Sequence, residues 1–200
     1  QAVFQTDARR LLAYSSVAQV GYMMLGLGMG TAAGLSAGML HLMNHALMKG
    51  ALFMALGAFA LNFGVRRVKD LAGLGQTMPA SSAAFTVAGL SLVGVPLTVG
   101  FTSKWYLVTA ALERGWWWAV AALMISSLLA LAYVARLLAA IWMENPPASR
   151  GGTPPARRLA PWMVLAPMSV LAVANIYFFF HADPLVGLAR AAANAVMGGN

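Results

Sequence analysis

Long apolar stretches separated by short polar segments make up most of the chain. Each stretch holds about 20 to 30 residues, enough to cross the hydrocarbon core of a bilayer as a helix. The stretches are Leu11–Gly30, Leu35–Phe63, Ser82–Leu112, Trp116–Met143 and Pro161–Phe180. Only helices or closed barrels satisfy their backbone hydrogen bonds in lipid. The pattern therefore predicts an all-α integral membrane protein with about five transmembrane helices.

The third stretch is long for one straight crossing and has helix-breaking residues at its centre. Pro96 removes a backbone donor, and the flanking Gly94 and Gly100 favour unwinding. We expect two half-helices joined by a non-helical piece within Gly94–Gly100. Irregular backbone at membrane depth must be buried in protein or line a hydrated cavity. Broken helices of this kind indicate an ion site in transporters.

The second stretch carries titratable residues at its middle. His41, His45 and Lys49 are spaced i, i+4, i+8, so on a helix they lie on one stripe of about 12 Å, with Asn44 beside it. Lys49 is about fourteen residues from either end, or roughly 20 Å, which is too deep for its side chain to reach water. An ionisable residue at that depth indicates a functional site.

Composition supports the bilayer as solvent. Hydrophobic residues make up 60% of the chain and charged residues only 9%, far fewer than a soluble domain carries. The chain has no cysteine, which excludes disulfides and thiolate metal sites. The net charge of +8 could suggest nucleic acid. Its basic residues, however, lie in short loops between apolar stretches, so we expect no nucleic-acid partner.

The distribution of basic residues predicts an orientation. Of the 13 Lys and Arg residues, Lys49, Lys104 and Arg136 lie within the apolar stretches. The polar segments alternate between the two sides of the membrane, and one side holds only Arg114 and Arg190. The remaining eight lie in segments 1–10, 64–80 and 144–160, which share the other side. The positive-inside rule makes that side, with the first residue, cytoplasmic and the C-terminus external, in a bacterial inner membrane. Because Gln1 is not an initiator, we expect the chain to begin within a longer protein.

The apolar stretches hold no carboxylate. All five acidic residues lie in loops or at the ends of stretches: Asp7, Asp70, Glu113, Glu144 and Asp183. This excludes paired-carboxylate acid–base chemistry and oxygen-rich cation sites. Buried lysines can load and release protons when a neighbouring charge moves, and histidines can shuttle them. The counter-charge is then expected in another segment or subunit.

Each candidate also has a simpler interpretation. His41 and His45 could be packed neutral histidines, or two ligands of a metal for which no third ligand is visible. Lys104, about eight residues from the end of its stretch, could partly reach water, although the adjacent break favours a function. Hydroxyl and amide groups would hold linking waters. These supporting candidates are Asn44, Ser103, Thr102, Tyr14 and Ser126.

Three ordered segments together resemble a known family. They are Gln5–Tyr22, the stripe His41/His45/Lys49, and Gly94–Lys104. The match is to the antiporter-like membrane subunits shared by respiratory complex I, Mrp-type Na⁺/H⁺ antiporters and membrane-bound hydrogenases. The residues from Gly94 onward are most similar to the D-type subunit of Mrp antiporters (MrpD), and subunit N of the quinone oxidoreductase is a close second.

The resemblance implies about fourteen helices in two inverted repeats, each with a broken helix. Residues 1–143 would belong to the second repeat, 144–160 would form a Pro/Gly/Arg-rich cytoplasmic loop, and 161–200 a closing helix and tail. It implies that Lys49 is the central lysine, that His41 and His45 are its relay partners, and that Lys104 faces the outer half-channel. The family's acidic residue would lie in a preceding N-terminal half.

We therefore predict a proton-translocating subunit of a multisubunit cation/proton antiporter, similar to MrpD. The alternative is a proton-pumping subunit of NADH:quinone oxidoreductase, similar to subunit N, or of a membrane-bound hydrogenase. A third possibility is a passive scaffold, in which Lys49 would tolerate Met. The chain would not itself be an enzyme and would hold no cofactor. Its partners would be other membrane subunits and lipid, with H⁺, and in an antiporter Na⁺, as the transported ions.

Overall fold

The computed structural model describes residues 1–145 and 157–198, and the regular structure in these ranges is helical. The middle of the predicted loop 144–160 lies outside the described residues. Four helices are long and apolar enough to cross a membrane, and a fifth crossing is made by two half-helices, α4 and α5. This confirms the predicted all-α fold. The main helices are α1 Ala8–Gly28, α2 Ala32–Phe63, α4 Pro79–Val93, α5 Val99–Glu113, α6 Trp117–Met143, α7 Trp162–Phe180 and α8 Asp183–Met197.

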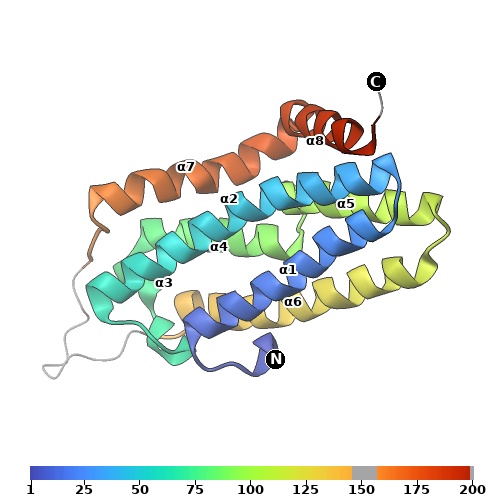
Figure 1. Cartoon of the computed structure of the whole chain (residues 1–200). Coiled ribbons are helices and arrows are strands. Elements are labelled where there is room, and N and C mark those ends of the chain that lie inside the picture. The colour runs from blue at the N-terminus through green and yellow to red at the C-terminus, as the bar shows by residue number, and fades with distance from the viewer. Residues whose placement is uncertain (146–156, 199–200) are drawn as a thin grey trace, which may run out of the picture.

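The longest helix, α2, lies at the centre of the bundle. It contacts α1, α4, α5, α7 and α8, and Figure 1 shows α7 and α8 following it along one side. The helix begins where the Thr31 hydroxyl accepts a hydrogen bond from the Gly34 amide at 3.1 Å, and it ends at Gly64 with φ +67°. Its 32 residues span about 48 Å. The central stripe of His and Lys is therefore surrounded by other helices.

The predicted break in the third stretch is present. Helix α4 ends at Val93, residues 94–98 are not helical, and α5 begins at Val99. Gly94 takes φ +90° and Leu97 takes φ +74°, both in the left-handed region that ends helices. Gly100, expected at the end of the break, lies instead in the first turn of α5.

The segment predicted as a loop, Gly64–Ala80, is more ordered than expected. It contains a 3₁₀ turn, η2 Val68–Leu71, and a single helical turn, α3 Leu74–Thr77, and α4 already starts at Pro79. Four apolar residues of this segment are 3% exposed or less: Val65, Leu71, Leu74 and Met78. Their burial folds the segment against the end of the bundle. Backbone hydrogen bonds also join it to the residues before α1, as at Val68 N–H to Thr6 O, 2.8 Å, and to the first residue of α1, as at Ala8 N–H to Arg66 O, 2.9 Å.

The tail beyond the last crossing forms a full helix. Val186 and Ala189 of α8 pack against Leu40 of α2, and Ala193 is also buried, whereas Arg190 and Asn194 are exposed. The helix is therefore amphipathic, with its apolar stripe on the bundle. In Figure 1 it continues beyond α7 beside the first part of α2.

Candidate functional site

Lys104 lies at the break between the two half-helices. Its side chain is 9% exposed, and its ammonium donates to the carbonyls of Leu92 at 3.1 Å and Val93 at 2.7 Å. These carbonyls end α4, where helix carbonyls have no partner in their own helix and carry partial negative charge. A third bond goes to the Ser127 hydroxyl on α6 at 3.0 Å. The positive charge of Lys104 is thus stabilised by the C-terminal carbonyls of α4 and by the Ser127 hydroxyl.

Two glycines allow this close approach. A Cβ atom on Gly94 would meet the Lys104 side chain at 2.8 Å, and one on Gly100 would overlap the carbonyl group of Ser91. The Gly100 amide instead donates to the Ser91 hydroxyl at 3.2 Å. The glycines therefore let α5 pack directly on the end of α4 and bring Lys104 to its carbonyls.

His41 joins three helices. Its side chain is fully buried; Nδ1 lies 2.9 Å from the Ser103 hydroxyl on α5, and Nε2 lies 3.0 Å from Oε1 of Gln19 on α1. The Tyr22 ring packs edge-on against the imidazole, with centroids 5.3 Å apart. The Lys104 ammonium lies 5.3 Å from the centroid of the same Tyr22 ring. His41 and Lys104 therefore contact one aromatic side chain.

Lys49 lies at the other end of the stripe. It is 6% exposed, and its ammonium donates to the Leu12 carbonyl at 2.7 Å and to the Ser15 hydroxyl, both on α1. The Phe53 ring lies 5.8 Å from the ammonium. Like Lys104, this lysine is held by backbone and hydroxyl oxygens. Among the described residues no carboxylate forms an ion pair with either lysine.

His45 and Asn44 lie between the two ends. The His45 ring stacks on His41 with centroids 6.4 Å apart, and its buried Nε2 has no hydrogen-bond partner in the described part of the chain. Asn44 donates to the Val99 carbonyl at 2.8 Å, which fastens the start of α5 to α2. Buried polar atoms of this kind are normally satisfied by ordered water.

The remaining predicted residues are placed differently. Ser103 is fully buried against His41, and Thr102 is half-buried without a side-chain hydrogen bond among the described residues. Tyr14 is 39% exposed and takes part in none of these contacts. Ser126 is half-buried, and its neighbour Ser127 is the residue that binds Lys104.

The structure adds Ser15, Gln19, Tyr22, Ser91 and Ser127 to the site. The first three are spaced i, i+4, i+7 on α1, so the sequence itself contains the helical period of a polar stripe, and the structure shows that this stripe faces α2. Ser91 and Ser127 stand among apolar residues without such a pattern, and only the packing of α4 and α6 identifies them.

Taken together, polar contacts run from one lysine towards the other along the centre of the bundle. Lys49 contacts Ser15, His45 stacks on His41, His41 contacts Ser103, and Tyr22 lies between His41 and Lys104. No group of three or more His, Asp or Glu side chains that could hold a metal occurs in residues 1–145 and 157–198. The groups present are proton carriers and hydrogen-bonding partners.

Comparison with known proteins assigns the family. Residues 1–130 match the family model described as the membrane domain of NADH:quinone oxidoreductase and Mrp antiporters. The chain belongs to this family. It is 44% identical over 180 residues to NADH-quinone oxidoreductase subunit N of Desulforudis audaxviator, covering 86% of the chain and 36% of that protein. It is 33% identical to F420H2 dehydrogenase subunit L of Methanosarcina mazei, covering 88% of the chain and 27% of that protein.

A solved member of the family has the same fold. A chain of the Mrp complex from Dietzia sp. superposes with a TM-score of 0.89 at 29% identity, covering 96% of this chain and 43% of that one. The chain thus spans well under half the length of these relatives. As a member of the NADH:quinone oxidoreductase/Mrp antiporter family with several apolar crossings, it is a multi-pass membrane protein.

Proposed function

We propose that the chain is the C-terminal part of a proton-translocating membrane subunit of a quinone-reducing respiratory complex, of the subunit N type. The observation that carries the proposal is that the two buried lysines lie at the ends of a row of polar residues, with His41 and His45 between them. The names of the two relatives, a subunit of NADH-quinone oxidoreductase and a subunit of F420H2 dehydrogenase, favour this function over that of an Mrp antiporter. The sequence motifs alone favour MrpD, and the relatives' names reverse that order.

An Mrp-type antiporter subunit is the second candidate. It is favoured by the superposition on a chain of the Dietzia Mrp complex, with a TM-score of 0.89. Both candidates use the same residues and differ in what drives the proton. The partners would be other membrane subunits of the complex, together with an N-terminal half that supplies an acidic residue. Redox centres would lie in those partners, and this chain would hold no cofactor.

The lysines are the sites where a proton would be loaded. A charged Lys104 is stabilised by the carbonyls that end α4 and by Ser127, and a charged Lys49 by the Leu12 carbonyl and Ser15. Burial opposes the charge in both cases. A change in charge in a neighbouring subunit would tip this balance and move the proton from one lysine towards the other.

His41 can take up a proton because each ring N–H of the protonated imidazole has an acceptor. When Nε2–H donates to Gln19 Oε1, the unprotonated Nδ1 accepts from the Ser103 hydroxyl. When both nitrogens are protonated, Nδ1–H donates to Ser103, whose own hydrogen can turn to the carbonyl of Val99 or Gly100, each at 3.3 Å. Because the Gln19 amide oxygen can accept a hydrogen bond but cannot pass on a proton, the exchanged proton enters and leaves the ring at Nδ1, on the side of Ser103.

The basic loops support an orientation, and the relative from Desulforudis audaxviator supports a bacterial membrane. Residues 1–10 would lie in the cytoplasm and the C-terminus outside, in the inner membrane of a bacterium. The half-channel from Lys104 would then open outwards, and Lys49 would face the cytoplasmic half.

The test separates the two candidates by their driving force. Proton movement is followed with a ΔpH-sensitive dye in inverted vesicles from cells that carry the intact complex. We expect acidification on addition of a reduced electron donor with quinone, abolished by a quinone-site inhibitor, and no acidification from an imposed Na⁺ gradient alone. Movement driven by Na⁺ without a donor would support the antiporter instead.

A further inference from the structure

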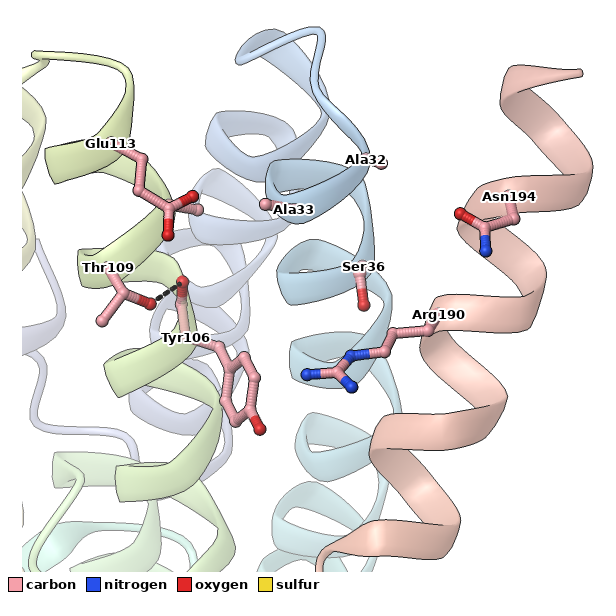
Figure 2. A pocket seen from close by; sticks show the side chains of 9 residues that line it. Ala32, Ala33, Ser36, Tyr106, Thr109, Glu113, Arg190 and Asn194 are labelled. Carbon is pink, nitrogen blue, oxygen red and sulfur yellow. Dashed lines mark hydrogen bonds between the residues drawn. The ribbon is translucent and has the colours of Figure 1, made fainter. Parts of the chain in front are cut away.

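A cavity at one end of the bundle carries both signs of charge on opposing walls. It has a volume of about 330 Å³ and lies between the start of α2, the second half of α5, and α8. Figure 2 shows the carboxylate of Glu113 reaching in from α5 and the guanidinium of Arg190 reaching in from α8. No hydrogen bond or ion pair joins these two groups in the described part of the chain. The remaining polar residues of the lining are Ser36, Tyr106 and Thr109, which bear hydroxyls, and Asn194, which bears an amide.

The cavity is separate from the proposed proton path. Its α5 residues, Tyr106, Thr109, Ala110 and Glu113, are spaced i, i+3, i+4, i+7 and form one stripe. At about 100° per residue this stripe is centred roughly opposite Lys104 on the helix. Lys104 faces α4 and α6, whereas the cavity faces α2 and α8. A proton channel from Lys104 therefore does not explain the cavity.

The depth of the cavity matches the headgroup layer of a bilayer. Helix α2 is about 48 Å long against a hydrocarbon core of about 30 Å, so roughly six residues extend beyond the core at each end. Ala32, Ala33 and Ser36, which line the cavity, belong to that end of α2. Trp117 and Trp118, 71% and 62% exposed, begin α6 just beyond the end of α5. Exposed tryptophans of this kind mark the interface.

We propose that this cavity binds the headgroup of a zwitterionic phospholipid with a primary ammonium group, of the phosphatidylethanolamine class. The phosphodiester would meet Arg190 and the hydroxyls, and the ammonium would meet Glu113. The volume is at the lower end of the range for small-ligand sites, about 300–1,000 Å³, and suits a headgroup. An anionic headgroup that lacks the ammonium would be repelled by the negative charge of the Glu113 carboxylate.

The test is a lipid titration of the delipidated protein in detergent, with thermal unfolding followed by tryptophan fluorescence. Each lipid is expected to raise the unfolding temperature, and we compare the lipid concentrations that give half of the full rise. For phosphatidylethanolamine this concentration should be about tenfold lower than for phosphatidylglycerol with the same acyl chains, because a charge-assisted hydrogen bond contributes about that much to affinity. Soluble glycerophosphoethanolamine at the same concentration should give no shift. An equal response to both lipids, or a response only to the soluble headgroup, would overturn the proposal.

Substitutions of the two charged residues test whether the lipid binds in this cavity. Glu113→Gln should remove the preference for phosphatidylethanolamine over phosphatidylglycerol, and Arg190→Gln should weaken both lipids. Arg114→Gln, next to the site but not part of its lining, is the matched control and should titrate like the unchanged protein. If the Glu113 and Arg190 variants titrate like this control, the headgroup does not bind here. Should either variant fail to fold, the comparison of lipids on the unchanged protein still decides.

Discussion

The ammonium of Lys104 lies 2.7 Å from the carbonyl oxygen of Val93, the last residue of α4. The break in the third crossing thus presents the negative end of one half-helix to a lysine on the other. Such an end can stabilise a partly buried cation by up to about 2 kcal/mol. This contribution replaces part of the counter-charge expected from outside the chain, and it depends on α4 and α5 meeting closely.

Gly100→Ala tests that close contact. The added methyl group would overlap the Ser91 carbonyl, so α5 must move away from the end of α4. We expect a loss of about 1–3 kcal/mol in stability, as for overpacked sites, together with reduced proton movement. Thermal unfolding in detergent and proton movement in vesicles measure the two effects.

Gly57→Ala is the matched control for this substitution. Gly57 is also helical, but a Cβ there meets no atom within 4 Å. Since alanine favours a helix over glycine by about 1 kcal/mol at most, this variant should be neutral or slightly more stable. If Gly100→Ala behaved like Gly57→Ala, the packing of the half-helices would not position Lys104.

Much of the fold follows from local patterns that the sequence displays. Apolar length predicts the crossings, and Pro96 with its glycines predicts the break, because these features act within one segment. The order in residues 64–80 could not be predicted in this way. There Leu71 and Leu74 are buried only because distant helices form the surface that receives them. The same holds for α8, whose apolar stripe requires Leu40 of α2.

Gln19→Ala tests how His41 is oriented. The variant removes the acceptor of the Nε2 hydrogen bond, so the ring is free to rotate away from Ser103. We expect proton movement to fall and its pH profile to shift, and the unfolding temperature to fall as well, because the buried Nε2–H loses its acceptor. A merely structural role would lower stability without shifting the pH profile.

Gln19→Glu is the informative companion variant. A carboxylate still accepts from Nε2–H, and its charge favours the protonated imidazole. The pH profile should therefore move towards higher pH compared with the unchanged protein, with activity partly retained. A profile identical to that of Gln19→Ala would contradict a hydrogen-bonding role for this residue.

The polar stripe on α1 shows how far the site itself is predictable. His41, His45 and Lys49 stand out because charged or titratable residues are costly within a membrane. Gln19 and Tyr22 are visible as polar residues of the first stretch, but their spacing does not say which helix they face. Ser127, the neighbour of the predicted Ser126, is the residue that binds Lys104, because one position along a helix rotates the side chain by about 100°.

Asp70→Asn tests the loop outside the membrane. Hydrogen bonds from the Arg67 amide and the Arg66 amide, and the nearby charges of Lys69 and Arg67, hold the pKa of the Asp70 carboxyl below its ordinary value. Because the folded pKa is lowered, the charged carboxylate stabilises the folded state at neutral pH, and this is lost as the pH falls through the folded pKa. Since Asp70 is exposed, we expect a loss below about 1 kcal/mol at pH 7.

Thermal unfolding from pH 7 down to about pH 3 measures this difference. The variant should be less stable than the unchanged protein at neutral pH, and the two curves should converge in acid. A difference that stays constant across this range would show that the carboxylate charge contributes nothing to stability.

Replacement of the central lysine tests the proposed relay most directly. Proton movement is measured in inverted vesicles with Lys49→Met, with Lys104→Met, and with Lys69→Met as a loop control; assembly of the complex is verified for each. We expect the first two variants to fall below about a tenth of the unchanged rate, since a positioned proton carrier contributes about 10²-fold or more. Lys69→Met should pump normally. Full proton movement in an assembled Lys49→Met complex would contradict the relay and leave the chain a passive scaffold.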